Sequence, residues 1–145
     1  PTGALFAIWE AAWREGAELV NEPGAWAMST LVTGGTAAAA AFYGTVFGWG
    51  IEPYGPASLF RLPGYVGGEP AQPVPRVVVA VMAPGDGPAT WAVDFWVADA
   101  EATVALAERL GGRVLVAPHD RPPAFRNAVI ADPAGAVLSV SQLLA

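Results

Sequence analysis

The alternation of apolar and polar positions along the chain predicts one series of elements twice: a strand, a helix and three further strands. In both predicted helices apolar residues recur three and four positions apart, whereas the last strand alternates between apolar and polar residues. Thr36 and Asp99 are residue types that cap helices, and glycines follow both helices. The first series comprises the strand 26–33, the helix 36–47 and the strands 51–54, 58–62 and 76–82. The second comprises the strand 90–97, the helix 100–110, the strand 113–117 and the hairpin 126–144.

The final hairpin contains a sequence pattern that also occurs at the start of the chain. Its turn is Asp132-Pro133-Ala134-Gly135, in which proline and glycine suit a tight reversal. The first nine residues, PTGALFAIW, align with PAGAVLSVS at residues 133–141. This repetition predicts an extra strand at Ala4–Ala11. It also indicates that residues 1–21 are the tail of a preceding module, a strand followed by a linker.

The element order defines an α+β fold built from two paired βαβββ modules, which we expect at residues 22–84 and 89–145. One helix per module can cover only one face of a strongly curved sheet. The opposite, concave face is therefore left to enclose a cavity. We predict a curved, cavity-enclosing sheet preceded by the extra N-terminal strand.

Composition narrows the classes of partner. Thirteen acidic and seven basic residues give a net charge of −6 without a basic stripe, so nucleic acid is not expected as a partner. No apolar run reaches the roughly 18 residues of a membrane span, and no basic leader precedes an apolar stretch. The chain has no cysteine, which excludes disulfides, thiolate nucleophiles and zinc–sulfur sites. We expect a cytoplasmic protein without a membrane partner.

Four short motifs lie at the ends of the predicted elements. They are NEPG at residues 21–24, AFYGTVFGW at 41–49, WVAD at 96–99 with LGG at 110–112, and ADPAG at 131–135. Together they resemble the vicinal oxygen chelate superfamily, which includes the glyoxalases, the bleomycin-resistance proteins and the extradiol dioxygenases. The chain looks most like the tandem glyoxalase-like proteins of high-GC bacteria, and the resemblance covers residues 22–144.

The resemblance implies where a metal ion would bind, because the metal enzymes of the superfamily carry His, Gln or Glu ligands on inward-facing strands. Counted from the motifs, these positions fall at Met28, Ala92 and Ser139, and the strand 76–82 contains no Asp, Glu or His. We therefore expect no metal site of the superfamily type and no cofactor. A divalent metal held in a non-standard way is the alternative.

Asp94 is the carboxylate of greatest interest, because strand alternation places it on the concave face with Ala92. Among tryptophan and valine side chains its pKa could be raised, and it could act as a general base or bind a cation. The alternative is a hydrogen-bonded Asp94 paired with Arg61, Arg76 or Arg126, or an Asp94 at a solvated rim of the sheet.

An apolar, aromatic pocket with a few polar groups is expected on the concave face. The predicted ligand-binding residues are Trp26, Met28, Thr30, Phe60, Asp94, Trp96 and Ser139, with Ser141 on the same face. A collapsed core without a pocket is the alternative. His119 is the only histidine and is expected to be solvated in a loop at residues 118–124.

These features favour a metal-free glyoxalase-like domain that binds a small aromatic or cationic molecule in a cavity between the modules. The likeness to bleomycin-resistance proteins suggests resistance by sequestration. One alternative is a metal-dependent lyase, isomerase or dioxygenase, for which Asp94 is the best catalytic candidate; the other is a structural pairing half of a tandem protein. An unpaired strand at Ala4–Ala11 would expose backbone groups, so we expect a homodimer or pairing with a preceding module.

Overall fold

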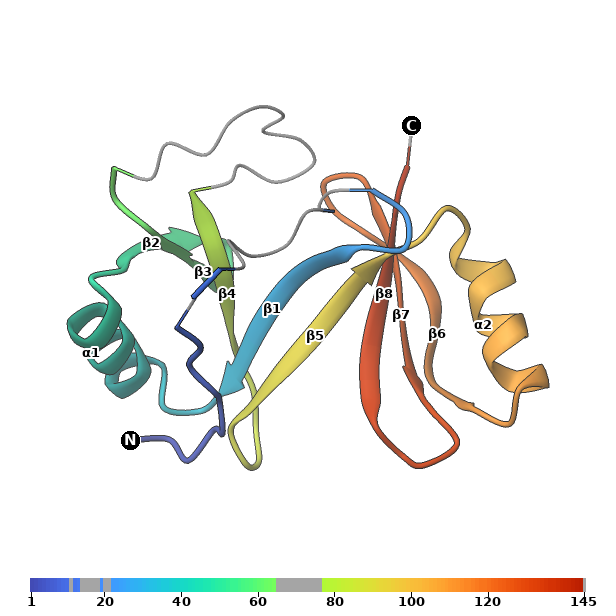
Figure 1. Ribbon diagram of the computed structural model, residues 1–145, viewed down its shortest axis with the longest axis horizontal. Coiled ribbons are helices and arrows are strands. Elements are labelled where there is room, and N and C mark those ends of the chain that lie inside the picture. The colour runs from blue at the N-terminus through green and yellow to red at the C-terminus, as the bar shows by residue number, and fades with distance from the viewer. Residues whose placement is uncertain (11, 14–18, 20–21, 65–76, 145) are drawn as a thin grey trace. The chain divides into compact units, whose positions relative to one another are not determined.

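The chain contains two βαβββ series, as predicted, and its α+β class is confirmed (Figure 1). The computed structural model describes residues 1–10, 12–13, 19, 22–64 and 77–144. Two compact units are present: residues 1–16 with 28–91, and residues 17–27 with 92–145.

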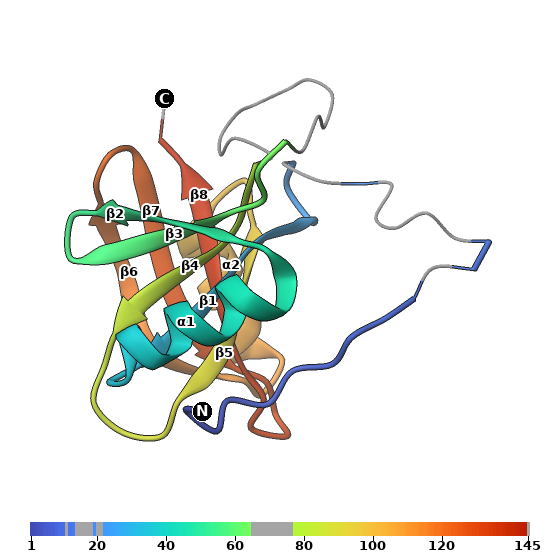
Figure 2. The same cartoon turned by 90° about the vertical axis from the view of Figure 1, so that its left-hand side faces the viewer.

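The strands of the first series lie in the order β2-β3-β4-β1, with β1 parallel to β4 and the other neighbours antiparallel. The elements are β1 (Trp26–Thr33), α1 (Thr36–Phe47), β2 (Gly50–Tyr54), β3 (Ala57–Arg61) and β4 (Val78–Pro84). Figure 2 shows α1 lying across the strands of this series. One helix therefore covers one face, as the element order requires.

Helix α1 is capped by a glycine at each end, Gly35 and Gly48. Its sequence contains five consecutive alanines, the residue type with the highest helix propensity, and Gly48 ends it with a left-handed φ of 68°. Thr36 is the first helical residue rather than the cap, which corrects the prediction. The N-cap is Gly35, whose backbone N–H donates to Thr33 Oγ1 at 3.1 Å.

The core of the first unit is aromatic. Leu31 and Phe60 are fully buried, and the ring of Tyr43 from α1 lies in the middle of the cluster. Other aromatic side chains contact the Tyr43 ring: Phe6, Phe42, Phe47, Trp49, Phe60 and Trp91. The Trp91 indole N–H donates to the Tyr43 hydroxyl at 2.9 Å, so this buried polar pair is satisfied.

The strands of the second series lie in the order β5-β8-β7-β6, with β5 parallel to β8 and the other neighbours antiparallel. The elements are β5 (Thr90–Trp96), α2 (Ala100–Arg109), β6 (Arg113–Arg121), β7 (Phe125–Ala131) and β8 (Val137–Leu143). The predicted hairpin between β7 and β8 is confirmed. Asp132 Oδ1 accepts from the Ala136 N–H at 2.8 Å, and Gly135 has a φ of 96°.

Helix α2 has the cap that the sequence predicts. Asp99 Oδ1 accepts from the Ala102 N–H at 2.8 Å, and Gly111 follows the helix with a φ of 88°. Its inner face packs Val104 against an aliphatic cluster on the strands: Ala128, Ile130 and Val140. The core of the second unit is therefore built without the aromatic rings that fill the first.

Strand β6 is longer than predicted. It continues through Pro118 to Arg121, so His119 lies in a strand opposite Asn127 and not in a loop. The register with β7 shifts between Val116 and His119, which is where the proline falls. β6 has a single neighbour within its unit, and an edge strand tolerates a proline at a register shift.

The extra strand predicted at Ala4–Ala11 is not formed. Residues 1–10 have no strand structure, and Ala11 lies outside the described residues. The segment is held by side chains instead: Ala4 packs against the core of the first unit, and the Phe6 ring lies 5.6 Å from that of Tyr43. Ile8, two residues beyond Phe6, is 80% exposed, so the alternating apolar residues of this segment do not share one buried face.

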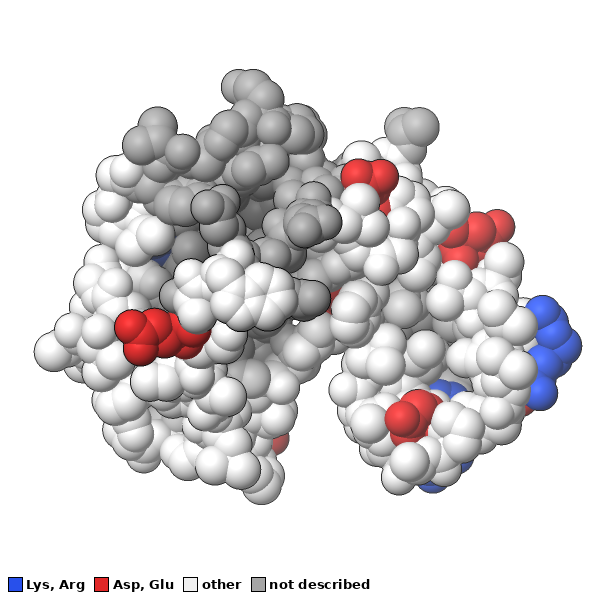
Figure 3. All heavy atoms as spheres, viewed as in Figure 1, with Lys and Arg blue, Asp and Glu red and all other residues white. Residues whose placement is uncertain are grey.

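In the part of the chain that the structure describes, no helix has the length and apolar character needed to cross a bilayer. The longer helix, α1, has 12 residues, whereas a span needs about 20. Figure 3 shows scattered acidic and basic side chains and no continuous basic area on the face in view.

Candidate functional site

The second unit presents one sheet face that α2 does not cover, and this face carries a group of polar side chains beside aromatic and aliphatic ones. Helix α2 packs on the face formed by Ala128, Ile130 and Val140, so residues of opposite parity point away from it. We call this surface the helix-free face. Its polar and aromatic side chains are those of Asp94 and Trp96 of β5, Ser139 and Ser141 of β8, Phe125 and Asn127 of β7, and His119 and Arg121 of β6, and the apolar Val116, Val129 and Leu143 lie on it as well.

The strand register brings these side chains together. Asp94 lies opposite Ser139, and Trp96 opposite Ser141. Asn127 lies between Ser141 and His119, and the rings of Phe125 and Trp96 are 5.7 Å apart. Residues directly opposite each other in neighbouring strands share a face, so the register alone assembles the site.

A chain of hydrogen bonds crosses three strands of this face. Asn127 Nδ2 donates to Ser141 Oγ at 2.5 Å, and Ser141 Oγ donates to Asp94 Oδ2 at 2.5 Å. An ionised carboxylate only accepts, so the Ser141 hydroxyl hydrogen points towards Asp94 and Asn127 must use its amide N–H. The free end of the Asn127 amide is therefore its oxygen.

Three buried polar atoms on the helix-free face have no hydrogen-bond partner: Asp94 Oδ1, Trp96 Nε1 and Asn127 Oδ1. They are all of the unpartnered buried side-chain nitrogens and oxygens found among the described residues. Each such atom costs about 1–3 kcal/mol when it is closed off from water, so a cluster of three calls for an explanation.

The environment of the Asp94 carboxyl group shifts its pKa. Burial raises its pKa above the ordinary value, and the hydrogen bond from Ser141, the polar Ser139 side chain on the neighbouring strand and the positive charge of Arg121 work in the opposite direction. The Ser139 hydroxyl itself donates to the Val93 carbonyl, at 3.3 Å. A higher pKa at this position is the shift that the sequence suggested for a carboxylate among apolar side chains.

The arginine partners proposed for Asp94 bind elsewhere. Arg61 pairs with Glu52 at 2.5 Å, and Arg126 pairs with Glu101 and Asp120. Arg76 lies outside the described residues. Arg121, which the sequence did not single out, is the cation that acts on Asp94.

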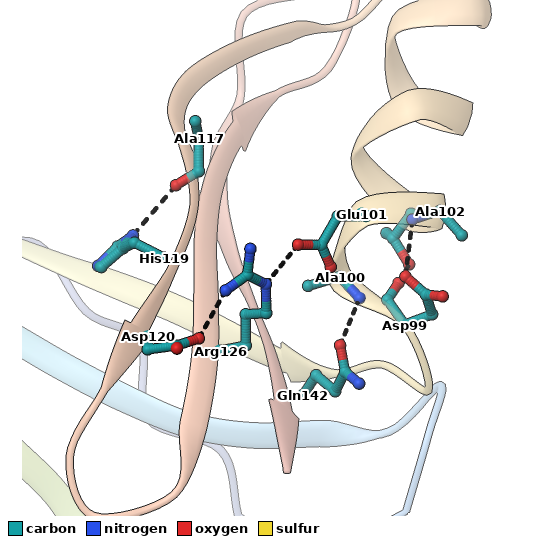
Figure 4. Close-up of polar contacts among 10 residues, drawn as sticks. Asp99, Ala100, Glu101, Ala102, Ala117, His119, Asp120, Arg126 and Gln142 are labelled. Atoms are coloured by element: carbon teal, nitrogen blue, oxygen red, sulfur yellow. Dashed lines mark hydrogen bonds and ion pairs between the residues drawn. The ribbon is translucent and has the colours of Figure 1, made fainter. Parts of the chain in front are cut away.

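The opposite side of the same strands has a separate, self-contained set of polar contacts (Figure 4). Arg126 of β7 links Glu101 of α2 to Asp120 of β6, and Gln142 Oε1 accepts from the Ala100 N–H at 2.9 Å. The contacts of Arg126 and Gln142 fix α2 and the rim of the sheet. On the helix-free face, His119 Nδ1 donates to the Ala117 carbonyl at 3.1 Å, which leaves Nε2 of the exposed ring as the free nitrogen.

The predicted ligand-binding residues are divided between the two units. Asp94, Trp96 and Ser139 come together on the helix-free face of the second unit. Met28 and Thr30 are half-buried in the first unit on the opposite face of β1 from Leu31, and Trp26 is 37% exposed in the second. The expected cavity between the modules remains a prediction.

Phe60 does not belong with this group. It is fully buried in the core under α1, in contact with Tyr43, Trp49 and Trp91. Its strand neighbours Ala80 and Met82 are also buried there, so the expectation that Phe60 shares a face with Met28 is wrong.

Asn127, Phe125 and Arg121 were not anticipated from the sequence. The signal for the first two was available, because the turn at residues 132–135 fixes the pairing of β7 with β8 and so places Asn127 beside Ser141. Arg121 could not be found in this way, because Pro118 indicated a loop where β6 in fact continues to Arg121.

A surface groove of about 360 Å³ lies in the first unit along β2 and β3. Its lining includes Ile51, Glu52 and Arg61, and the two charged side chains neutralise each other. The groove therefore offers less recognition chemistry than the helix-free face, and we do not assign it a role.

The residues at the superfamily's metal positions do not fit a divalent cation. Met28 and Ala92 offer no nitrogen or oxygen donor in their side chains, Ser139 is a weak ligand, and β4 contains no Asp, Glu or His. Among the described residues, no three His, Asp or Glu side chains gather into a possible metal site. We therefore derive no chemistry through a metal ion.

Comparison with known families identifies the class of protein. A model of the glyoxalase-like domain matches residues 27–141, and the chain belongs to this family. A structure of the Mn(II)-bound glyoxalase from Novosphingobium aromaticivorans superposes with a TM-score of 0.56 over 81% of this chain and 38% of the other, at 17% identity. At that identity the match supports the fold alone.

Two curated relatives are similar in sequence. The chain is 38% identical over 146 residues to the protein named "Putative glyoxylase CFP32" of Mycobacterium tuberculosis, covering 97% of this chain and 52% of the relative. It is 36% identical over 143 residues to the anthracycline biosynthesis protein DnrV of Streptomyces peucetius, covering 99% of this chain and 50% of the relative. The chain thus spans about half the length of the curated relatives it matches.

Proposed function

We propose that this domain binds a small aromatic molecule on the helix-free face of the second unit, without a metal ion. The observation that supports the proposal is the hydrogen-bonded series Asn127–Ser141–Asp94 beside the rings of Trp96 and Phe125. A site with a few convergent polar groups beside aromatic rings is what small-molecule pockets usually offer.

Two features favour an aromatic ligand. The rings of Trp96 and Phe125 lie 5.7 Å apart with an interplanar angle of 43°, so they do not stack on each other and can contact a third ring. The similarity to a protein named for anthracycline biosynthesis points the same way, because anthracyclines are polycyclic aromatic compounds. The proposal concerns binding by this domain and leaves the reaction of any longer protein open.

The proposal is tested by isothermal titration of chelator-treated protein with doxorubicin, a readily available anthracycline. We expect saturable binding in excess EDTA, weakened by Phe125→Leu. Tyr54→Leu is the matched control, because Tyr54 is a 53% exposed aromatic residue on β2 of the first unit.

The same titration distinguishes the metal-dependent alternative. Binding that appears only after Mn(II) is added would overturn the metal-free proposal and favour a metal enzyme of the superfamily. Absence of binding under both conditions would remove aromatic ligands of this size from consideration, and with them the proposal itself.

A further inference from the structure

We propose that an uncharged apolar patch on the first unit is the surface through which this chain binds a second copy of itself. We call it the N-terminal patch, and it consists of Leu5, Phe6, Ile8 and Trp9 of the N-terminal segment and Val46 of α1. Each of these side chains has between 45% and 92% of its surface exposed. Large apolar groups gathered at this degree of exposure indicate a contact surface. This contact is independent of the ligand binding proposed for the second unit.

The N-terminal segment lies against α1, which places the patch on one side of that helix. Thr2 Cγ2 lies 3.0 Å from the point that a Cβ would occupy at Gly35, the N-cap of α1. Further along, the centroid of the Phe6 ring lies 6.3 Å from that of Phe42 in α1. Val46 is one helical turn beyond Phe42, so it adjoins the ring that Phe6 contacts. The other members of the patch lie within three residues of Phe6 in the chain.

The matching sequence pattern at residues 133–141 shows what the patch lacks. Ile8 aligns with Val140 of β8. Val140 is 2% exposed because it packs in the core under α2, whereas Ile8 is 80% exposed. An apolar position that is covered in one occurrence of the pattern and open in the other indicates a partner from outside the single chain.

The absence of charge favours a second copy as that partner. Residues 1–9 and α1 contain no charged side chain, and Glu10 is the first one after the patch. A two-fold interface places a surface against itself, so any charge within it would face the same charge. An uncharged apolar surface avoids this repulsion and is complementary to itself.

A membrane is the less suitable partner for the same patch. Segments that lie in the membrane interface combine apolar side chains with Lys and Arg, which are attracted to anionic lipids. The patch has no basic residue, and the whole chain carries a net charge of −6.

The size of the patch predicts a weak, reversible dimer. A standard interface takes roughly 20–30 residues from each partner, and the N-terminal patch is smaller than that. The net charge of −6 also makes two copies repel each other. We therefore expect a Kd on the order of 10 µM. Added NaCl should strengthen the dimer by screening the repulsion, whereas it would weaken an interface built from ion pairs.

Sedimentation equilibrium from about 2 to about 200 µM protein measures this Kd and its dependence on salt. The double variant Leu5→Glu/Ile8→Glu places carboxylates in the patch, and the two-fold axis brings those of both copies together. We expect it to raise the dimer Kd about a hundredfold or more. The matched control, Leu106→Glu/Leu110→Glu, adds the same charge at exposed leucines of the second unit and should keep the Kd within about threefold of the wild type.

All four substituted leucines and isoleucines are exposed, so both double variants should keep the wild-type circular dichroism spectrum. A wild-type chain that stays monomeric at about 200 µM overturns the inference, and so does a dimer that the two double variants weaken equally. Vesicles of phosphatidylcholine provide the remaining comparison. If the wild-type chain cosediments with them as a monomer and Leu5→Glu/Ile8→Glu does not, the patch binds lipid and the inference is overturned.

Discussion

Two tryptophans on one strand, Trp91 and Trp96, show how differently the two units use the same residue type. Trp91 belongs to the first unit, where its indole N–H is satisfied by Tyr43 within an aromatic core under α1. Trp96 belongs to the second unit, where it is 6% exposed and its N–H has no partner. Five positions apart, they have opposite parity on β5 and so serve opposite faces.

The difference extends to the cores that the two helices cover. α1 packs on aromatic rings, and α2 packs on valine, isoleucine and alanine. The repeated element order therefore fixes the architecture of each unit but not its chemistry. In the second unit the sheet face under α2 is packed with aliphatic side chains. The buried polar atoms without a hydrogen-bond partner, among the described residues, all lie on the other face.

The strongest way to break the first unit is to empty its aromatic core. Phe60→Ala should lower the free energy of unfolding by about 3–5 kcal/mol, because Phe60 is fully buried and its removal leaves a cavity. Ile130→Val, a one-methylene change in the core of the second unit, should cost only about 0.5–1.5 kcal/mol. Urea unfolding followed by circular dichroism measures both, and similar losses would contradict the full burial of Phe60.

The two tryptophans can be compared directly. Trp91→Phe and Trp96→Phe remove the same atoms, but only the first breaks a hydrogen bond and leaves the Tyr43 hydroxyl without its donor. Trp91→Phe should therefore be about 1 kcal/mol more destabilising. Equal losses in denaturant unfolding would mean that Trp96 Nε1 has a partner in solution.

The helix caps differ between the units as well. Asp99→Ala should cost about 1 kcal/mol, because the Asp99 side chain accepts from the first turn of α2. Thr36→Ala should change stability by far less, since Thr36 is inside α1 and Gly35 is its cap. Thermal unfolding of the two variants tests the assignment, which would be refuted by a larger loss at Thr36.

The smallest expected effect concerns pH. Because the pKa of Asp94 is raised in the folded chain, the folded state holds this proton to higher pH than the unfolded state does. The stability that it contributes is complete below the unfolded pKa and is lost as pH rises through the folded pKa. Asp94→Asn removes this dependence, so its stability relative to the wild type should be higher at pH 7.5 than at pH 4.

That comparison is made by urea denaturation at the two pH values, with Asp86→Asn as the exposed control. A relative stability that falls with rising pH would show that the opposing contributions of Ser141, Ser139 and Arg121 outweigh burial.

Much of the architecture could be predicted from the sequence because glycines and helix caps mark the element ends. The strand Trp26–Thr33 and the helix Thr36–Phe47 have the predicted bounds. Alternation also placed Asp94, Trp96 and Ser139 on one face. In each case a local signal, a cap or a period of two, was enough.

Other features depend on contacts that no local pattern contains. The face of Phe60 could not be assigned with certainty from a strand whose neighbour, β4, is apolar on both faces, and a shift of one residue reverses the face. Pro118 indicated a loop, but an edge position with a register shift lets β6 continue. The place of Asn127 in the site follows only from the pairing of β7 with β8, which sets it opposite Ser141.

The sequence pattern repeated at residues 1–9 and 133–141 separates two features that usually occur together: side-chain packing and backbone pairing in a sheet. In the second copy, β8 lies between β5 and β7, and its amides are locked by neighbours on both sides. In the first copy Phe6 is anchored among rings, yet residues 1–10 belong to no strand or helix. We therefore expect the amide hydrogens of residues 1–10 to exchange with solvent faster than those of β8. One sequence pattern thus occurs once as a strand within a sheet and once as a segment held by its side chains.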